Sequence, residues 1–289
     1  MTTASRPLAT ALWERASRAT GYRPATPRGG TRPDKPIDQY VRTDATAFRD
    51  HLISEKMAGQ SIVRIISTIK AIINFAATES GIPNNASFTG LYIDRSLGRT
   101  ERQPISLANI RILQEKCFRL HDERRCLIAL ISDTGMRLGE AVGLLKSDFK
   151  TIDSIPVVEI RPYSWRRLKT KNSQRVVPLV GWSLWARDHI LRSGNRSDFA
   201  FPCYNKTKLS NSNSASAALN KWIDSQIPNC GTIHIFRHSL RDRLRKIETP
   251  SDIVDQIGGW TTSGVGHSYG QGYPLSVLHR WMLQIAEPK

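Results

Sequence analysis

Apolar residues recur at intervals of three and four positions between residues 62 and 76, and this is the most regular pattern in the chain. The apolar positions are Ile62, Ile65, Ile66, Ile69, Ile72, Ile73 and Ala76. Such spacing places them on one face of an α-helix. Ser61 is predicted to cap this helix and Gly81-Ile82-Pro83 to end it. A helix that begins at Asp44 and buries Phe48 and Leu52 is predicted before it, so this region must fold by packing helices together.

The same spacing returns after Pro104. One helix is predicted to begin at Ser106, a second to stop at Gly135, and a third to carry Leu138, Val142 and Leu145. Further helices are predicted at 215–225, 235–247, 251–257 and 276–286. Two stretches, IPVVEIR (155–161) and RVVPLV (175–180), are typical of strands and flank the polar turn LKTKNSQ. The predicted fold class is therefore mainly α with a small antiparallel β-sheet.

Residues 21–36 hold four prolines and three glycines together with four basic residues. A stretch of this composition cannot maintain a helix or a strand and is typical of a flexible linker. We therefore divide the chain into a basic flexible arm (1–36), a helical domain (37–100) and a larger domain (101–289).

Charge narrows the class of partner. The chain carries 42 Lys and Arg against 25 Asp and Glu, a formal charge of +17, which points to a nucleic acid or an acidic membrane surface. No apolar run approaches the roughly 20 residues that cross a bilayer, so we expect no membrane partner and favour nucleic acid. The four cysteines form no CxxC pair, which indicates a reducing compartment.

Cleavage of a phosphodiester without a metal needs a nucleophile, fixed positive donors for the phosphate oxygens and an acid for the leaving oxygen. The segment DTGMRLGEAVGLLKSDF places Arg137 at a helix start and Glu140 one turn later, where it could position a basic partner. These two residues alone would more often be a surface ion pair. The segment RRLKTKNSQRVVPL offers Lys169 and Lys171 on a turn, either of which could act as a general acid or contact a phosphate.

The segment HIFRHSLRDRLRK predicts a helix with two different faces. Phe236, Leu240, Leu244 and Ile247 form the predicted buried stripe. The other face is predicted to carry one imidazole and three guanidiniums, from His234, Arg237, Arg241 and Arg245. A histidine aligned with several arginines favours phosphate binding over a structural role.

The segment QIGGWTTSGVGHSYGQGY adds an indole and a phenol. Its glycines allow a close approach of the backbone to a ligand. Trp260 offers an N–H donor, and Tyr269 becomes a useful nucleophile only beside strong positive groups. A tyrosine among glycines would by itself more often be a packing residue.

Taken in order, these motifs resemble the tyrosine recombinase (phage integrase) family. TGMRLGEAVGL resembles the box with the first catalytic arginine, which assigns Arg137 to that role and Glu140 to support. KTKNSQRVVPL is similar to the family pattern KTxxSxRxVPL and favours Lys169 over Lys171 as the catalytic lysine. HIFRH resembles the HxLRH box, and GGW the variant with a tryptophan. This assigns roles to His234, Arg237 and Trp260, and the nucleophile expected nine residues later is Tyr269.

The resemblance implies a two-domain C-shaped clamp around double-stranded DNA and a site-specific recombinase or integrase. The enzyme would cut and rejoin DNA through a 3′-phosphotyrosyl intermediate, without a cofactor or metal. It also implies a homotetramer on two DNA sites, accessory DNA-bending proteins, and a cytoplasmic, nucleoid-associated location. Arg241, Arg245 and Lys171 are the predicted further DNA contacts, and helix 276–286 is expected to pack on a neighbouring subunit or on its own domain.

Three other functions remain open from the sequence. A catalytically inactive DNA-binding regulator could use the same fold, and a type IB topoisomerase shares the chemistry. A metal-dependent nuclease could use His234, His238 or His267, although no paired carboxylates or His/Asp cluster at ligand spacing accompany them. One departure from the family also stands out, because residues 37–100 predict two helices where the family's core-binding domain has four or so.

Overall fold

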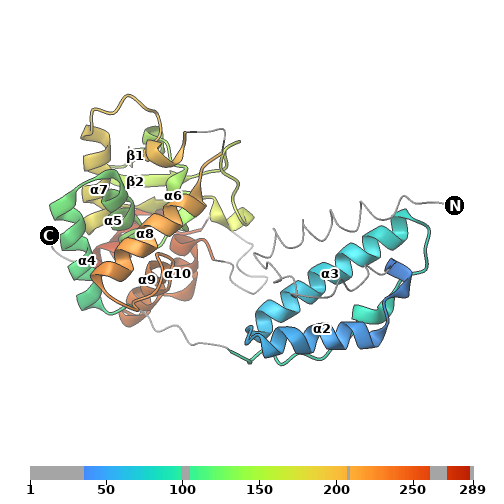
Figure 1. The fold of residues 1–289 in the computed structure, drawn as a ribbon. Helices are drawn as coiled ribbons and strands as arrows, with labels where there is room; N and C mark the ends of the chain where they lie inside the picture. The colour runs from blue at the N-terminus through green and yellow to red at the C-terminus, as the bar shows by residue number, and fades with distance from the viewer. Residues whose placement is uncertain (1–35, 99–104, 207–208, 261–271, 287–289) are drawn as a thin grey trace. The chain divides into compact units, whose positions relative to one another are not determined.

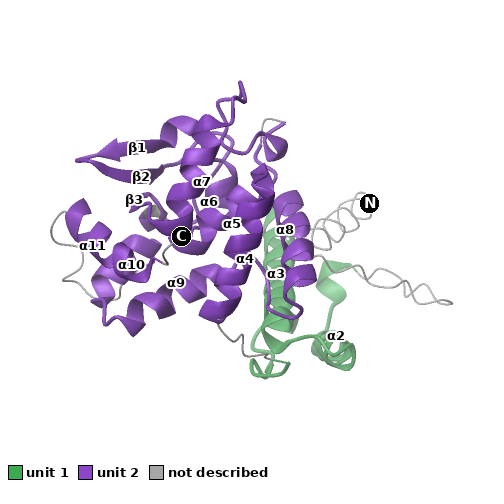
Figure 2. Cartoon of the chain, turned by 90° about the vertical axis from the view of Figure 1, so that its left-hand side faces the viewer, with its two compact units in different colours: residues 1–101 green, residues 102–289 purple. Residues whose placement is uncertain are grey.

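Helices dominate the structure, a computed structural model that describes residues 36–98, 105–206, 209–260 and 272–286. The chain divides into two compact units, residues 1–101 and 102–289 (Figure 2). Residues 1–35 of the predicted arm (1–36), and also His267 and Tyr269, lie outside the described residues. Together with the sheet described below, the helices confirm the predicted mainly α class.

Unit 1 contains two α-helices, α2 (Arg42–Ser54) and α3 (Gly59–Glu79), and two short 3₁₀ turns, η1 (Ile37–Gln39) and η2 (Ala86–Phe88) (Figure 1). Its core consists of Ala45, Leu52, Ile62, Ile65, Ile66, Ile73 and Phe88. The prediction that Ser61 caps α3 was wrong, because the helix begins at Gly59. A tertiary contact explains the earlier start: the N–H of Gly59 donates to the carbonyl of Leu97 at 2.8 Å.

Helix α3 corrects one expectation about apolar runs. It has 21 residues, of which 18 consecutive ones have a mean hydropathy of 1.4, so by length and composition alone it could cross a membrane. That is weak evidence, since buried helices of globular domains pass the same test. In this structure the isoleucines of its apolar face pack against α2 and Phe88.

Unit 2 is built around α5 (Glu123–Thr134), whose residues from Cys126 to Thr134 are all buried. Helix α4 (Leu107–Leu120) and helix α7 (Gly181–Arg192) both pack against it. The hydroxyl of Ser106 accepts a hydrogen bond from the N–H of Asn109 at 3.2 Å, which confirms the predicted cap. Gly135 ends α5 as predicted, with a φ of 59°.

Two helical predictions in unit 2 need correction. Helix α7 was not foreseen, and the third helix is only the five-residue α6 (Leu138–Val142). The chain turns at Gly143, and Leu145 already precedes the 3₁₀ turn η3 (Lys146–Asp148). An ideal Cβ on Gly143 would lie 2.7 Å from the Arg166 side chain, so the close packing of that arginine requires glycine here.

A three-stranded antiparallel sheet has the order β1-β2-β3. The two predicted strands are β2 (Ile155–Ile160) and β3 (Arg175–Pro178), and Val158 pairs with Val177. The third strand, β1 (Phe149–Ile152), was not predicted from the sequence, because only its first residue is buried. The segment between β2 and β3 contains the 3₁₀ turn η4 (Lys171–Ser173).

The remaining elements are η5 (Pro202–Tyr204), α8 (Ser212–Gln226), α9 (Ile235–Lys246), α10 (Ser251–Gly258) and α11 (Leu275–Ile285). The four helices match the predicted ones closely. Figure 1 shows α9 and α10 beside each other, and they are in contact. Helix α11 packs on β2, β3 and α9 of its own unit and buries Leu278, Met282 and Ile285. Of the two alternatives for this helix, the structure contains the intramolecular one.

Candidate active site

Arg137 and Glu140 form the base of the candidate site at the start of α6. The backbone N–H of Arg137 donates to Glu140 Oε2 at 3.0 Å, and its Nη1 donates to Oε1 at 2.6 Å. The same Nη1 donates to Ser173 Oγ at 2.9 Å, which ties α6 to η4. Nη1 therefore bonds a carboxylate oxygen and a hydroxyl at once, and these two contacts fix the orientation of the guanidinium. The sequence therefore placed this pair correctly, and the structure adds Ser173.

Arg175 is a buried arginine to which the sequence analysis gave no role. Its Nη2 donates to Glu140 Oε2 at 3.1 Å, its Nη1 to the carbonyl of Ser173 at 2.8 Å, and its Nε to the carbonyl of Ile257 at 2.8 Å. Burial by itself would raise the pKa of Glu140, but Arg175 and Arg137 outweigh it and hold that pKa below its ordinary value. A charged residue at the start of an apolar strand was the signal in the sequence.

Arg237 joins the site from the first turns of α9. It is buried, and its Nη1 donates to the carbonyl of Gly135 at 2.9 Å. Its Nη2 is buried and has no hydrogen-bond partner among the described residues. Burial, together with Arg137 and Arg175, lowers the pKa of this guanidinium to about 9. The neighbouring arginines therefore destabilise the charged form of Arg237, and a bound anion would offset their repulsion.

Trp260 follows α10, and its indole lies against Arg237 and Arg241. Its backbone N–H donates to the carbonyl of Asp255 at 3.0 Å. The guanidinium carbons of Arg237 and Arg241 lie 4.3 and 5.0 Å from its ring centre. A Cβ on Gly258 would lie 1.7 Å from this ring, so the first glycine of GGW makes room for the indole.

His234 and Lys169 are placed less tightly. His234 is the exposed residue before α9, and its ring centre lies 5.2 Å from that of His238. Lys169 is exposed in the segment between β2 and β3. The next residue, Thr170, has its Oγ1 3.0 Å from Ser173 Oγ, the hydroxyl that Arg137 contacts. Lys169 is therefore attached to the segment that supports Arg137, and Lys171 begins η4 within the same segment.

The predicted nucleophile, Tyr269, lies outside the described residues, but both flanks of its segment contact α10. On one side, Trp260 is bonded to Asp255. On the other, the N–H of Tyr273 donates to Gln256 Oε1 at 2.8 Å and Gln256 Nε2 donates to the carbonyl of Tyr273 at 3.0 Å. Two consecutive residues of α10 therefore hold the described ends of the segment, and Gln256 was not identified from the sequence.

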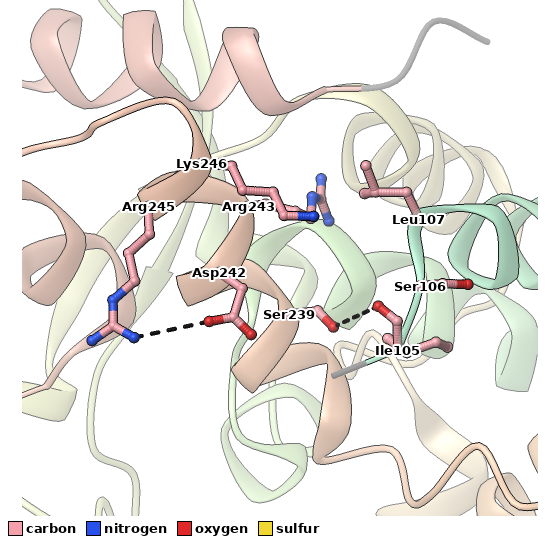
Figure 3. A pocket seen from close by; sticks show the side chains of 8 residues that line it. All are labelled: Ile105, Ser106, Leu107, Ser239, Asp242, Arg243, Arg245 and Lys246. Carbon is pink, nitrogen blue, oxygen red and sulfur yellow. Dashed lines mark hydrogen bonds and ion pairs between the residues drawn. The ribbon is translucent and has the colours of Figure 1, made fainter. Parts of the chain in front are cut away.

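The arginines of α9 do not share one exposed face, contrary to prediction. Arg241 contacts Asp255 at 3.3 Å and covers Trp260. Arg245 pairs instead with Asp242 and lines a cavity of about 510 Å³ beside the start of α4 (Figure 3). Arg243, which was not singled out, is buried and pairs with Asp133 at 2.9 Å. Helical spacing alone cannot separate an arginine paired in the core from one at the surface.

The arrangement can bind an anion. Four guanidiniums, from Arg137, Arg175, Arg237 and Arg241, meet two carboxylates in these contacts, Glu140 and Asp255. In the described part of the chain no three His, Cys, Asp or Glu side chains form a group that could hold a metal ion.

Residues 108–272 match the phage integrase family, and this match covers more than half of the chain. The chain belongs to the phage integrase family. Members of this family are tyrosine recombinases that act on DNA, and the matched range contains every residue of the candidate site. No curated protein matches the chain in sequence.

Solved structures share the fold. The Tn1549 transposon integrase in complex with circular intermediate DNA is 15% identical, with a TM-score of 0.61 over 90% of this chain and 92% of that one. A lambda integrase tetramer bound to a Holliday junction is 15% identical, with a TM-score of 0.59 over 90% and 76%. A lambda integrase dimer bound to a COC' core site is 16% identical, with a TM-score of 0.60 over 90% and 75%. At such low identity these likenesses concern the fold.

Proposed function

We propose that this member of the phage integrase family is a site-specific DNA recombinase that cuts and rejoins double-stranded DNA without a cofactor or metal. The observation that carries the proposal is the surplus of guanidinium charge beside Trp260. A phosphodiester is an anion of suitable size and geometry, because arginine can bind two of its oxygens at once. Arg237 Nη2, which lacks a partner among the described residues, is a donor available to such a ligand once the site adjusts.

In the proposed reaction the phenol of Tyr269 gives its proton to His234, and the phenol oxygen attacks the scissile phosphorus. A 3′-phosphotyrosyl bond forms while the bond to the 5′ oxygen breaks, and Lys169 donates a proton to that leaving oxygen. Arg137, Arg237, His234 and Trp260 hold the non-bridging oxygens, where fixed donors stabilise the developing charge. Glu140 supports Arg137. In the reverse direction, a 5′-hydroxyl attacks the phosphotyrosine and DNA is rejoined.

We assign unit 2 to catalysis and unit 1 to a shortened DNA-binding domain, with the two closing around the duplex as a C-shaped clamp. Arg241 and Lys171 are proposed further DNA contacts, and so is Arg245, from its separate cavity. Four copies on two DNA sites are proposed as the working assembly, with accessory DNA-bending proteins. The DNA-bound lambda integrase tetramer supports this by analogy of fold. A cytoplasmic, nucleoid-associated location follows from this function.

The test uses a DNA duplex with a nick close to the cut, so that the short released strand diffuses away and the covalent intermediate accumulates. Wild-type protein is expected to form a covalent protein–DNA adduct in magnesium-free buffer that contains a chelator. Tyr269→Phe is expected to bind the same DNA and form none, with Tyr273→Phe as the matched control that keeps activity.

Each other outcome points to a different function. Salt-sensitive DNA binding without an adduct would favour an inactive regulator, and loss of cleavage with the chelator would favour a nuclease. Relaxation of supercoiled DNA without strand exchange would favour a topoisomerase. An adduct that persists in Tyr269→Phe overturns the assignment of the nucleophile.

A further inference from the structure

We propose that Arg175 is the positioning residue of this site, which holds Arg137 in the orientation needed to bind the scissile phosphate. The inference rests on the proposed function, because it concerns the same reaction. Arg175 lies in β3, away from Arg137 in sequence, and none of the roles derived above for DNA cleavage requires it.

Arg137, Glu140, Arg175 and Ser173 form a closed ring of contacts. Arg137 donates to Glu140 Oε1 and to Ser173 Oγ, at 2.6 and 2.9 Å. Arg175 donates to Glu140 Oε2 and to the carbonyl of Ser173, at 3.1 and 2.8 Å. The two arginines therefore share the same two neighbours. A change in Arg175 would remove one hydrogen bond from each of the two residues that orient Arg137.

Arg175 is itself held in place by α10 and Gly259. Its Nε donates to the carbonyl of Ile257 at 2.8 Å, at the end of α10. Gly259 has a φ of 62°, and a Cβ on it would lie 2.7 Å from Arg175 Nη1. Gly259 thus lets the backbone before Trp260 lie directly against the guanidinium. Arg175 connects the Arg137 ring to the segment that carries the indole.

Arg175 is less accessible to a substrate than Arg137. The Arg175 side chain is only 5% exposed, and each of its three nitrogens already donates to a protein acceptor. The Arg137 side chain is 23% exposed. Arg175 therefore acts through Arg137. The planar fork of arginine serves three acceptors in fixed directions, which one lysine ammonium cannot reproduce.

The experiment is a double-mutant cycle on the nicked DNA substrate. Arg175→Lys is expected to slow covalent adduct formation by about 10- to 100-fold, with the Kd for DNA changed less than about threefold. Arg137→Ala is expected to slow it by roughly 100- to 1,000-fold. Because both act through Arg137, the double variant is expected within about threefold of Arg137→Ala alone. A double variant slowed by the product of the two single effects overturns the proposal.

Arg243→Lys is the matched control. Its side chain is also 5% exposed, and it also donates to two carbonyls and a carboxylate. As a structural arginine, it is expected to lower Tm and to combine multiplicatively with Arg137→Ala in adduct formation. Equal coupling of Arg243→Lys and Arg175→Lys to Arg137→Ala would mean that burial alone explains the effect, which overturns the proposal.

Two further results also bear on the proposal. If Arg175→Lys shows no cooperative unfolding transition, Gly259→Ala replaces it in the cycle, because its Cβ would displace Arg175 Nη1, and the result is interpreted by the same criterion. If wild-type protein binds DNA but forms no adduct, the proposed function fails. An active wild type with independent Arg175 and Arg137 effects leaves the proposed function intact and removes only this inference.

Discussion

Unit 2 contains two buried ionic clusters that share helix α9 but differ in charge balance. In the α5 cluster, defined here as Gln114, Asp133 and Arg243, one carboxylate meets one guanidinium. Asp133 accepts from Gln114, Arg243 and the N–H of Trp182, while Arg243 also donates to the carbonyls of Ser132 and Ile285. In the site cluster, defined as Arg137, Glu140, Arg175 and Arg237, three guanidiniums meet one carboxylate.

This difference in charge balance separates a structural ion pair from a binding site. A buried charge is costly unless it is paired and hydrogen-bonded. The α5 cluster is balanced and needs nothing more. The site cluster keeps a surplus of positive charge, which disfavours the empty site and favours an anionic ligand. In the sequence Arg237 and Arg243 look alike, because both lie on the same amphipathic helix and are distant from the acids of their clusters.

The largest expected effect contrasts Arg237 with Arg243. Arg237→Lys is expected to slow covalent adduct formation by roughly 100-fold or more, because lysine loses the fork that would meet the phosphate oxygens. Arg243→Lys is expected to keep the rate within about threefold and to lower Tm instead. Single-turnover cleavage and thermal unfolding on the same preparations measure both. Comparable rates in the two variants would break the distinction between the clusters.

A pair of glycine substitutions sharpens the role of Trp260. Gly258→Ala is expected to slow adduct formation by about 10- to 100-fold, because its Cβ would lie 1.7 Å from the indole and must push it off Arg237. Gly139→Ala, in α6, meets no atom within 4 Å and is expected to leave the rate unchanged and the fold slightly more stable. If both variants cleave like wild type, the position of the indole is not important for the reaction.

Anion binding without DNA gives a smaller effect. At constant ionic strength, inorganic phosphate is expected to raise the Tm of the wild type by a few degrees, since it binds only the folded site. Arg237→Met is expected to lose most of that increase, and Arg243→Lys to keep it. Phosphate also stabilises proteins by exclusion from their surface, so the decisive quantity is the difference between variants. An identical increase in all three proteins would argue against an anion site here.

The smallest effect concerns the pH dependence of Glu140. Its pKa is held below the ordinary value of 4.5, so the ionised carboxylate stabilises the fold above that pH. The difference in unfolding free energy between wild type and Glu140→Gln is expected to be constant from pH 7 to about 5. It should shrink only as the pH falls through the lowered pKa. Denaturant titrations at several pH values test this, and a loss already complete at pH 5 would contradict the direction of the shift.

Local patterns predicted much of the fold. Ser106 and Gly135 delimit helices where the sequence placed them, since caps and left-handed turns depend on neighbouring residues. Ser61 failed because the start of α3 is determined by a contact with Leu97, which no local pattern contains. Strand β1 failed for a related reason, because it is short and pairs with β2 while remaining largely exposed.

The candidate site shows the same division. Arg137, Glu140, Arg237 and Trp260 were found from motifs and are joined by contacts in the structure. Ser173 and Arg175 occupy the serine and arginine positions of the KTxxSxRxVPL pattern, but they were given no role, and Gln256 was missed. The contacts that make these three residues important are with partners distant in sequence. Arg243 and Arg245 show the limit most clearly. They lie two residues apart on one helix, and only the three-dimensional packing makes the first a core residue and the second a surface one.

The hydrogen bond from Arg243 to the carbonyl of Ile285 affects any exchange of α11 between copies of the chain. A copy whose α11 packed on a neighbour instead would leave the buried guanidinium of Arg243 without one of its acceptors. This would destabilise that copy by about 1–3 kcal/mol. It would also expose the apolar surface against which Leu278 and Met282 pack. Displacement of α11 is therefore unfavourable in free energy for an isolated molecule. The lost contacts are restored only in a closed ring of copies, where each molecule that gives up its α11 receives the α11 of a neighbour.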